Sequence, residues 1–223
     1  MSIPSPKVSP TVTLNTGNTA DCVNYIKNAL SGSHIVIKVT HKHVDKAIFD
    51  IIKGTDKTII FKEEGVEWIF NGKDITNETK DIDLTVNIAK LIETTSVDKV
   101  ALEEKFKNAD VCIISFSANG LLPGKATVKV KLCRDWLSGK DKNNMYIYYY
   151  NKTTKLAELV ANGLKVDSDG YVQFNITHNS DYIVSDKELV QAGILPKTGY
   201  AIDTQVTVAN SFFIPLLIIS LLN

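Results

Sequence analysis

The feature that most constrains the fold is a series of short β-strand patterns that follow one another along most of the chain. Each segment is rich in β-branched or aromatic residues, and turn-forming residues separate it from the next. Strands at this spacing, with few helical patterns among them, favour an antiparallel β-sandwich-like fold. The predicted strands are residues 34–40, 57–64, 66–72, 80–91, 110–119, 125–133, 144–151, 155–162 and 170–178.

Local patterns add a hairpin and up to three short helices to this picture. Gly65 lies between two strand patterns and predicts a hairpin turn. Residues 20–30 and 42–54 have apolar side chains at helical spacing, and Gly54 suits a helix C-terminus. Residues 96–108 fit a helix with Ser96 as N-cap, or a polar excursion. We therefore predict a mainly β fold with one to three short helices.

Composition argues against a nucleic-acid partner. The chain has 223 residues with equal numbers of acidic and basic side chains, so its formal net charge is zero. Arg134 is the single arginine, and arginine is the side chain preferred for phosphate and guanine recognition. The three cysteines, Cys22, Cys112 and Cys133, have no C-x-x-C spacing. One disulfide with a free thiol, or three buried thiols, would both fit this count.

The predicted organisation has four parts. Residues 1–19 read as a Pro/Ser/Thr-rich linker, and residues 20–188 as the β-rich module. Residues 189–199 form a spacer with a short motif, and residues 200–223 form an apolar tail. The N-terminal stretch lacks a basic-then-apolar export pattern, so we expect the chain to be one end of a longer protein.

The tail contains a stretch long enough to enter a bilayer. Residues 206–222 would measure about 26 Å as a helix, close to the short limit for a hydrocarbon layer of about 30 Å. Pro215 and the lack of amphipathic spacing argue against a buried helix of the core. We therefore predict a hydrophobic C-terminal helix outside the fold.

The pentapeptide before this tail carries the functional signal: it consists of Leu195, Pro196, Lys197, Thr198 and Gly199. With the apolar segment behind it, it resembles the LPXTG cell-wall sorting signal of Gram-positive surface proteins. The resemblance implies that a sortase cysteine attacks the Thr198 carbonyl and cleaves the bond to Gly199. An amine of a peptidoglycan precursor then takes the acyl group, and the tail contacts the membrane transiently. The basic residues that usually end such signals are not in this sequence.

The body of the chain carries a second resemblance. The segments "WIFNGKDI", "GLLPGKATVKV" and "MYIYYYNKTTKLAELVANGLKVDSDGYVQFNITHNSDYIV" are similar to a module near the C-terminus of clostridial surface proteins. Together the resemblances imply an extracellular, wall-anchored, non-catalytic spacer or adhesion module without a cofactor. They also raise the Lys–Asn isopeptide cross-links found in such surface proteins, although the sequence does not identify a pair.

Two other classes of surface protein remain as alternatives. Small residues, a polar spacer and an apolar tail without basic residues also describe a GPI anchor signal. A lectin-like module is the second alternative, with a host or carbohydrate ligand as partner. Tyr146, Tyr148 and Tyr150 share one face of a predicted strand and are the candidate glycan contacts, with sheet core as the competing interpretation.

Two metal-site patterns are weak. The segment 166–171 holds Asp167, Asp169 and Gly170, as a calcium loop does at its start, but the expected later Glu ligand is absent. A β-turn is the preferred interpretation. His41 and His43 share a face if extended, but no third ligand is in register, so we predict no metal site.

No catalytic constellation is predicted either. His178 and Asp181 lie near Ser180 and Ser185, but no nucleophile elbow accompanies them. P-loop, dinucleotide and H-E-x-x-H motifs do not occur. We therefore predict that the chain is a substrate of an enzyme and not an enzyme itself.

Overall fold

The structure is a computed structural model, and it describes residues 14–189 and 194–195. Its helices are α1 (Thr19–Asn28), α2 (Ala47–Ile52), α3 (Lys99–Phe106) and α4 (Arg134–Leu137), with 3-10 turns η1 (Gly72–Asp74) and η2 (Leu91–Glu93). Its strands are β1 (Leu14–Asn15), β2 (His34–Lys38), β3 (His43–Val44), β4 (Thr58–Glu63), β5 (Val66–Asn71), β6 (Ile82–Asp83), β7 (Val86–Lys90), β8 (Cys112–Lys131), β9 (Met145–Asn151), β10 (Leu156–Leu164), β11 (Tyr171–Ser185) and β12 (Ile194–Leu195).

The prediction of a mainly β fold is confirmed, but the main sheet is mixed. Ten strands form one sheet in the order β1-β2-β4-β5-β8-β11-β9-β10-β12, with β7 on β8, and β3 pairs with β6 separately. The pairs β1/β2, β2/β4 and β10/β12 are parallel, so a wholly antiparallel arrangement is wrong. The described residues also hold four α-helices, one more than predicted. Parallel neighbours need a crossover connection, and α1 and α2 supply the first two.

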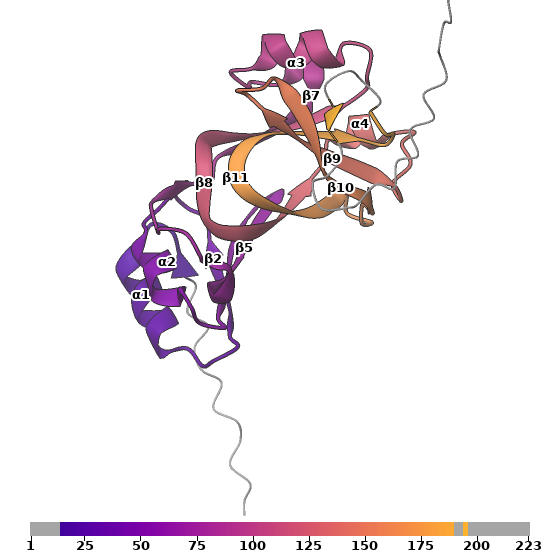
Figure 1. Cartoon of the computed structure of the whole chain (residues 1–223). Coiled ribbons are helices and arrows are strands. Elements are labelled where there is room, and N and C mark those ends of the chain that lie inside the picture. Colours follow the sequence, from indigo (N-terminus) through magenta and orange to yellow (C-terminus); the bar gives the residue numbers. More distant parts are fainter. Residues whose placement is uncertain (1–13, 190–193, 196–223) are drawn as a thin grey trace, which may run out of the picture.

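The N-terminal part packs these two helices against the sheet (Figure 1). Asn18 begins α1, because its side-chain oxygen accepts a hydrogen bond from the amide of Asp21. Cys22 and Ile26 of α1 are buried, as are Ile48 and Phe49 of α2. The helix predicted over residues 42–54 is shorter, because residues 43–44 form β3 instead.

The C-terminal part is built around two long bent strands, β8 and β11 (Figure 1). β8 runs through both predicted strands 110–119 and 125–133 without a break. Its register with β11 shifts twice. From Ser115 to Gly120, and again from Leu121 to Ala126, β8 contains more residues than the part of β11 that faces it. Extra residues on one strand of a pair bend it. The two irregularities therefore explain the curvature of β8.

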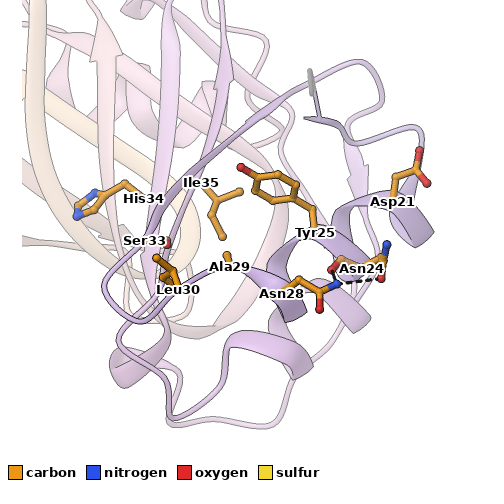
Figure 2. A pocket seen from close by; sticks show the side chains of 9 residues that line it. All are labelled: Asp21, Asn24, Tyr25, Asn28, Ala29, Leu30, Ser33, His34 and Ile35. Atoms are coloured by element: carbon orange, nitrogen blue, oxygen red, sulfur yellow. Dashed lines mark hydrogen bonds between the residues drawn. The ribbon is translucent and has the colours of Figure 1, made fainter. Parts of the chain in front are cut away.

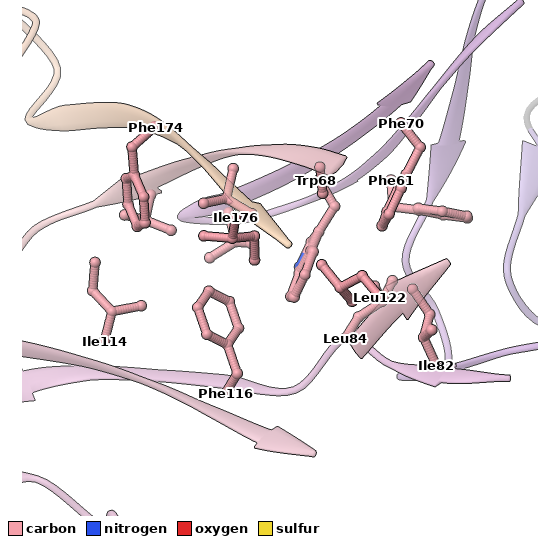
Figure 3. Close-up of a cluster of buried hydrophobic side chains, with 14 of the residues drawn as sticks. Phe61, Trp68, Phe70, Ile82, Leu84, Ile114, Phe116, Leu122, Phe174 and Ile176 are labelled. Carbon is pink, nitrogen blue, oxygen red and sulfur yellow. The ribbon is translucent and has the colours of Figure 1, made fainter. Parts of the chain in front are cut away.

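Apolar side chains on the two faces of this sheet form two clusters. The larger cluster runs from the helices α1 and α2 to the inner face of the bent strands, where Trp68 stacks on Phe70 and meets Phe116 edge-on (Figure 3). The smaller cluster lies under α3 and includes Leu102 and Phe106. Because both faces are covered, alternate side chains of β8, β9 and β11 enter different clusters.

Other local predictions have mixed outcomes. The hairpin at Gly65 is confirmed as β4/β5, with φ of +80° at that glycine. Residues 80–91 are not one strand but β6 and β7. The helix in 96–108 is confirmed as α3, although Asp98 and not Ser96 precedes it. None of the helices in the described part of the chain is long and apolar enough to cross a bilayer.

Candidate functional site

The sorting motif begins where the described fold ends. Leu195 lies in β12, opposite Glu158 of β10, so this residue is paired with the edge of the main sheet. Pro196, Lys197, Thr198 and Gly199 lie outside the described residues, and so does the predicted tail helix over 206–222. The structure thus places the start of the motif next to β10.

The tyrosines proposed as glycan contacts belong to the protein interior. Their predicted alternation on β9 is confirmed, because Tyr148 and Tyr150 enter the cluster under α3 while Ile147 enters the larger one. Tyr148 and Tyr150 are each only 1 % exposed. The Tyr148 hydroxyl accepts a hydrogen bond of 2.9 Å from the amide of Leu189. A sugar ring cannot stack on these two side chains, so the glycan-contact hypothesis does not hold for them; Tyr146 is half-buried beside them.

The most developed polar arrangement is a buried charge cluster, here called the Lys152 cluster and made of Ser96, Asp98, Lys152 and Asp181. The ammonium nitrogen of Lys152 is 2.8 Å from Asp98 Oδ2 and 3.4 Å from Asp181 Oδ2. The hydroxyl of Ser96 donates to Asp181 Oδ2 over 2.8 Å. The Asp181 side chain is 2 % exposed. The cluster ties the turn after β9 to β11 and to the N-terminus of α3.

The electrostatics of this cluster favour a charged lysine. Burial acts to lower the pKa of Lys152, but its contacts with Asp98 and Asp181 outweigh that effect and raise the pKa above its ordinary value. Lys152 is therefore an ammonium ion at neutral pH and lacks the free electron pair that a nucleophilic amine needs. We infer that the cluster holds three elements together.

Next to the cluster is an open hollow of about 410 Å³, lined in part by Tyr149, Lys152, His178 and Asn179. The rings of His178 and Tyr149 pack edge-on with centroids 4.1 Å apart. Asn179 is 5 % exposed, and its side-chain oxygen has no hydrogen-bond partner. Burial lowers the pKa of His178, with a smaller opposing effect from Glu158.

This environment of His178 predicts a loss of stability in mild acid. The fold disfavours the imidazolium, so the unfolded chain binds a proton at a higher pH than the folded chain does. The stabilising contribution is therefore complete above the unfolded-state pKa of about 6.5 and is lost as pH falls below it. We expect the melting temperature to fall between pH 7.5 and 5.5, and to fall less in His178→Phe. His34→Gln changes an exposed side chain and is the control; its melting temperature should vary with pH as that of the parent does. If the melting temperatures of the parent and of His178→Phe fall equally with pH, the prediction is wrong.

A second hollow, of about 750 Å³, lies between α1 and the start of β2 (Figure 2). Asp21, Asn24, Tyr25 and Asn28 share one side of α1 and line it, together with His34 from β2. Tyr25 is 46 % exposed, and the amide of Asn28 donates to the backbone oxygen of Asn24 over 2.9 Å. An exposed ring beside amide and carboxylate groups can stack on and hydrogen-bond to a polyhydroxylated ligand.

The calcium-like segment forms the predicted turn. Asp167 Oδ1 accepts hydrogen bonds from the amides of Asp169 (3.0 Å) and Tyr171 (2.9 Å). Its other oxygen is 3.2 Å from the ammonium of Lys129. Gly170 has φ of +89°, a conformation that favours glycine. The carboxylate of Asp167 is thus engaged in the turn that leads into β11.

The two histidines considered for a metal site, His41 and His43, have separate partners. His41 Nδ1 lies 3.3 Å from the Thr40 hydroxyl, whereas His43 Nε2 lies 3.2 Å from Asp81. Within residues 14–189 and 194–195, no three His, Cys, Asp or Glu side chains gather as a metal site would require.

The residues considered for a triad also have separate partners. The Ser180 hydroxyl donates to the backbone oxygen of Tyr150 (3.2 Å), and the Ser185 hydroxyl donates to that of Lys187 (2.7 Å). Asp181 contacts Lys152 and Ser96 and takes no hydrogen bond from His178. These side chains do not form a Ser-His-Asp relay.

Comparisons with protein-family models, with curated proteins and with solved structures gave no match.

Proposed function

We propose that this chain is a non-catalytic module of a sortase-anchored surface protein, attached to peptidoglycan through Thr198. The observation that carries the proposal is the order of its C-terminal segments: the motif Leu195–Gly199 is followed by an apolar stretch over residues 206–222. In this reaction the sortase thiolate attacks the Thr198 carbonyl, and the new amine of Gly199 leaves with the tail. An amine of the wall precursor then displaces the enzyme, so the module becomes amide-linked at Thr198.

The path of the chain through the sheet supports a spacer role. β1 and β12 are the first and last strands in the order of the main sheet, so the two ends of the described chain lie at opposite edges of that sheet. A module that connects an outer domain to the wall needs its attachment points apart. Pro196 is the next residue in the sequence after β12, and proline has no N–H to donate to a neighbouring strand.

The test is the location of the protein after one substitution in the motif. The chain is secreted from a Gram-positive host that carries a sortase, and membrane, medium and wall fractions are separated after digestion of the peptidoglycan. Thr198→Ala should abolish the wall-linked form, because the acyl donor residue that the enzyme recognises is lost. Lys197→Ala is the matched control, since this is the variable position of the motif, and should stay wall-linked.

Two results would overturn the proposal. One is Thr198→Ala protein that is still released only by digestion of the wall. The other is release of the parent protein from the surface of its source organism by a phosphatidylinositol-specific phospholipase, which would identify a lipid anchor instead.

A further inference from the structure

The two ends of β8 meet in space. A straight strand of 20 residues would span about 65 Å at roughly 3.3 Å per residue. Instead, the indole N–H of Trp136, which follows β8, donates to the backbone oxygen of Asp110, which precedes it, over 3.3 Å. The ammonium of Lys140 also lies 2.6 Å from the carboxylate of Asp110. The bent strand visible in Figure 1 thus closes into a loop with a seam at these residues.

Two of the three cysteines lie at this seam. Cys112 is the first residue of β8 and is fully buried, while Cys133 follows the end of β8 and is half-buried. The sulfur of Cys133 is 3.4 Å from the backbone oxygen of Ile88 on β7. That strand pairs with the start of β8, where Lys90 lies opposite Cys112. Cys112 belongs to the larger apolar cluster, Cys133 packs against the same cluster, and both thiols are free.

The two thiols have different chemical roles. The neighbouring Cys112 thiol lowers the pKa of Cys133 to about 7, while Cys133 and burial raise the pKa of Cys112. The more exposed sulfur is therefore a thiolate for much of the time at neutral pH, and the thiolate is the attacking species in disulfide exchange. Cys22 differs, because it lies on the buried side of α1 and its thiol donates to the backbone oxygen of Asn15 over 3.3 Å.

From this geometry we infer that Cys112 and Cys133 form a disulfide that locks the loop of β8 shut. With a small-molecule disulfide such as oxidised glutathione as oxidant, the Cys133 thiolate attacks one sulfur and expels a glutathione thiolate. Cys112 then attacks Cys133, its proton passes to the second departing thiolate, and the protein disulfide forms. The protein loses two electrons and two protons, and one glutathione disulfide becomes two glutathione thiols. The inference does not depend on the proposed function.

The experiment uses the full chain in reduced form, treated with oxidised glutathione at pH 7.5. Mass spectrometry of the intact protein should show loss of two hydrogens, and non-reducing peptide maps should join the peptides of Cys112 and Cys133. The melting temperature should rise by about 5–10 °C, because the bond closes a loop of roughly 20 residues, and dithiothreitol should reverse the change. Cys22→Ala is the matched control and should oxidise as the parent does.

Substitution of the buried partner tests the order of attack. Cys112→Ala should stop at a mixed disulfide between glutathione and Cys133. If this variant does not fold, the parent and Cys22→Ala still decide the question. Parent protein that keeps glutathione on Cys133 without forming the internal bond would overturn the inference, as would a bond that includes Cys22.

Discussion

Replacing Gly124 with alanine should destabilise the protein by at least about 3 kcal/mol, the upper range for an overpacked site. A Cβ atom at this position would lie 2.0 Å from the backbone oxygen of Asp74 and 2.8 Å from Cα of Ile75. Both are backbone atoms, so no side-chain rotation relieves the clash. The segment they belong to is also fixed to β8, because the amide of Asn77 donates to the backbone oxygen of Pro123 over 2.9 Å. The alanine must therefore separate η1 from β8.

Urea denaturation of the parent and variant measures this loss. Gly139→Ala is the matched control: it has φ of +77° and nothing within 4 Å of the added Cβ, so only backbone strain of about 1 kcal/mol is expected. If Gly124→Ala is no less stable than Gly139→Ala, the close approach of η1 to β8 does not exist in solution.

The close contact at Gly124 also shows where sequence-based prediction stops. The Pro123-Gly124 pair predicts a break between two strands, and it is an ordinary turn signal. In the structure β8 continues through it, because the pair lies at a bend where another backbone segment packs. That partner comes from residues 74–77, far away in sequence. By contrast, the hairpin at Gly65 depends on neighbouring residues alone, and its prediction is confirmed.

The parallel part of the sheet could have been predicted from the sequence. A helix over residues 42–54 between strands 34–40 and 57–64 is a strand-helix-strand pattern, which favours parallel neighbours. The many short strand patterns further along the chain are typical of antiparallel sheets, and they led to the prediction of an antiparallel fold instead.

The tyrosines of β9 show a different limit of sequence-based prediction. Alternation assigns their faces correctly, but only the tertiary position of α3 shows that Tyr148 and Tyr150 are covered.

The Lys152 cluster had no signal in the sequence at all. Asp98, Lys152 and Asp181 belong to three elements, and no spacing rule connects them. Each alone reads as a solvated surface charge. The bend of β8 and β11 and the packing of α3 bring them together, so the cluster is a product of the tertiary fold.

Removal of the lysine from this cluster should have the second large effect on stability. Lys152→Met keeps most of the side-chain volume but leaves the carboxylate of Asp181, 2 % exposed, without its cation. Breaking a buried ion pair costs about 3–5 kcal/mol, and the 25 % exposure of Lys152 reduces the expected loss to about 2–3 kcal/mol. Lys155→Met is the matched control, because Lys155 is 60 % exposed and 3.8 Å from Asp98, and it should cost less than about 1 kcal/mol.

Two further measurements separate lost charge pairing from lost packing. Protonation neutralises an unpaired carboxylate, so the difference in unfolding free energy between Lys152→Met and the parent should shrink when the pH is lowered toward 4. Adding Asp181→Asn to Lys152→Met should recover part of the loss, because the amide oxygen can still accept the hydrogen bond from Ser96 without a buried charge. If instead the difference is constant with pH and the second substitution adds to the loss, Lys152 stabilises the fold through its hydrocarbon chain and not through its charge.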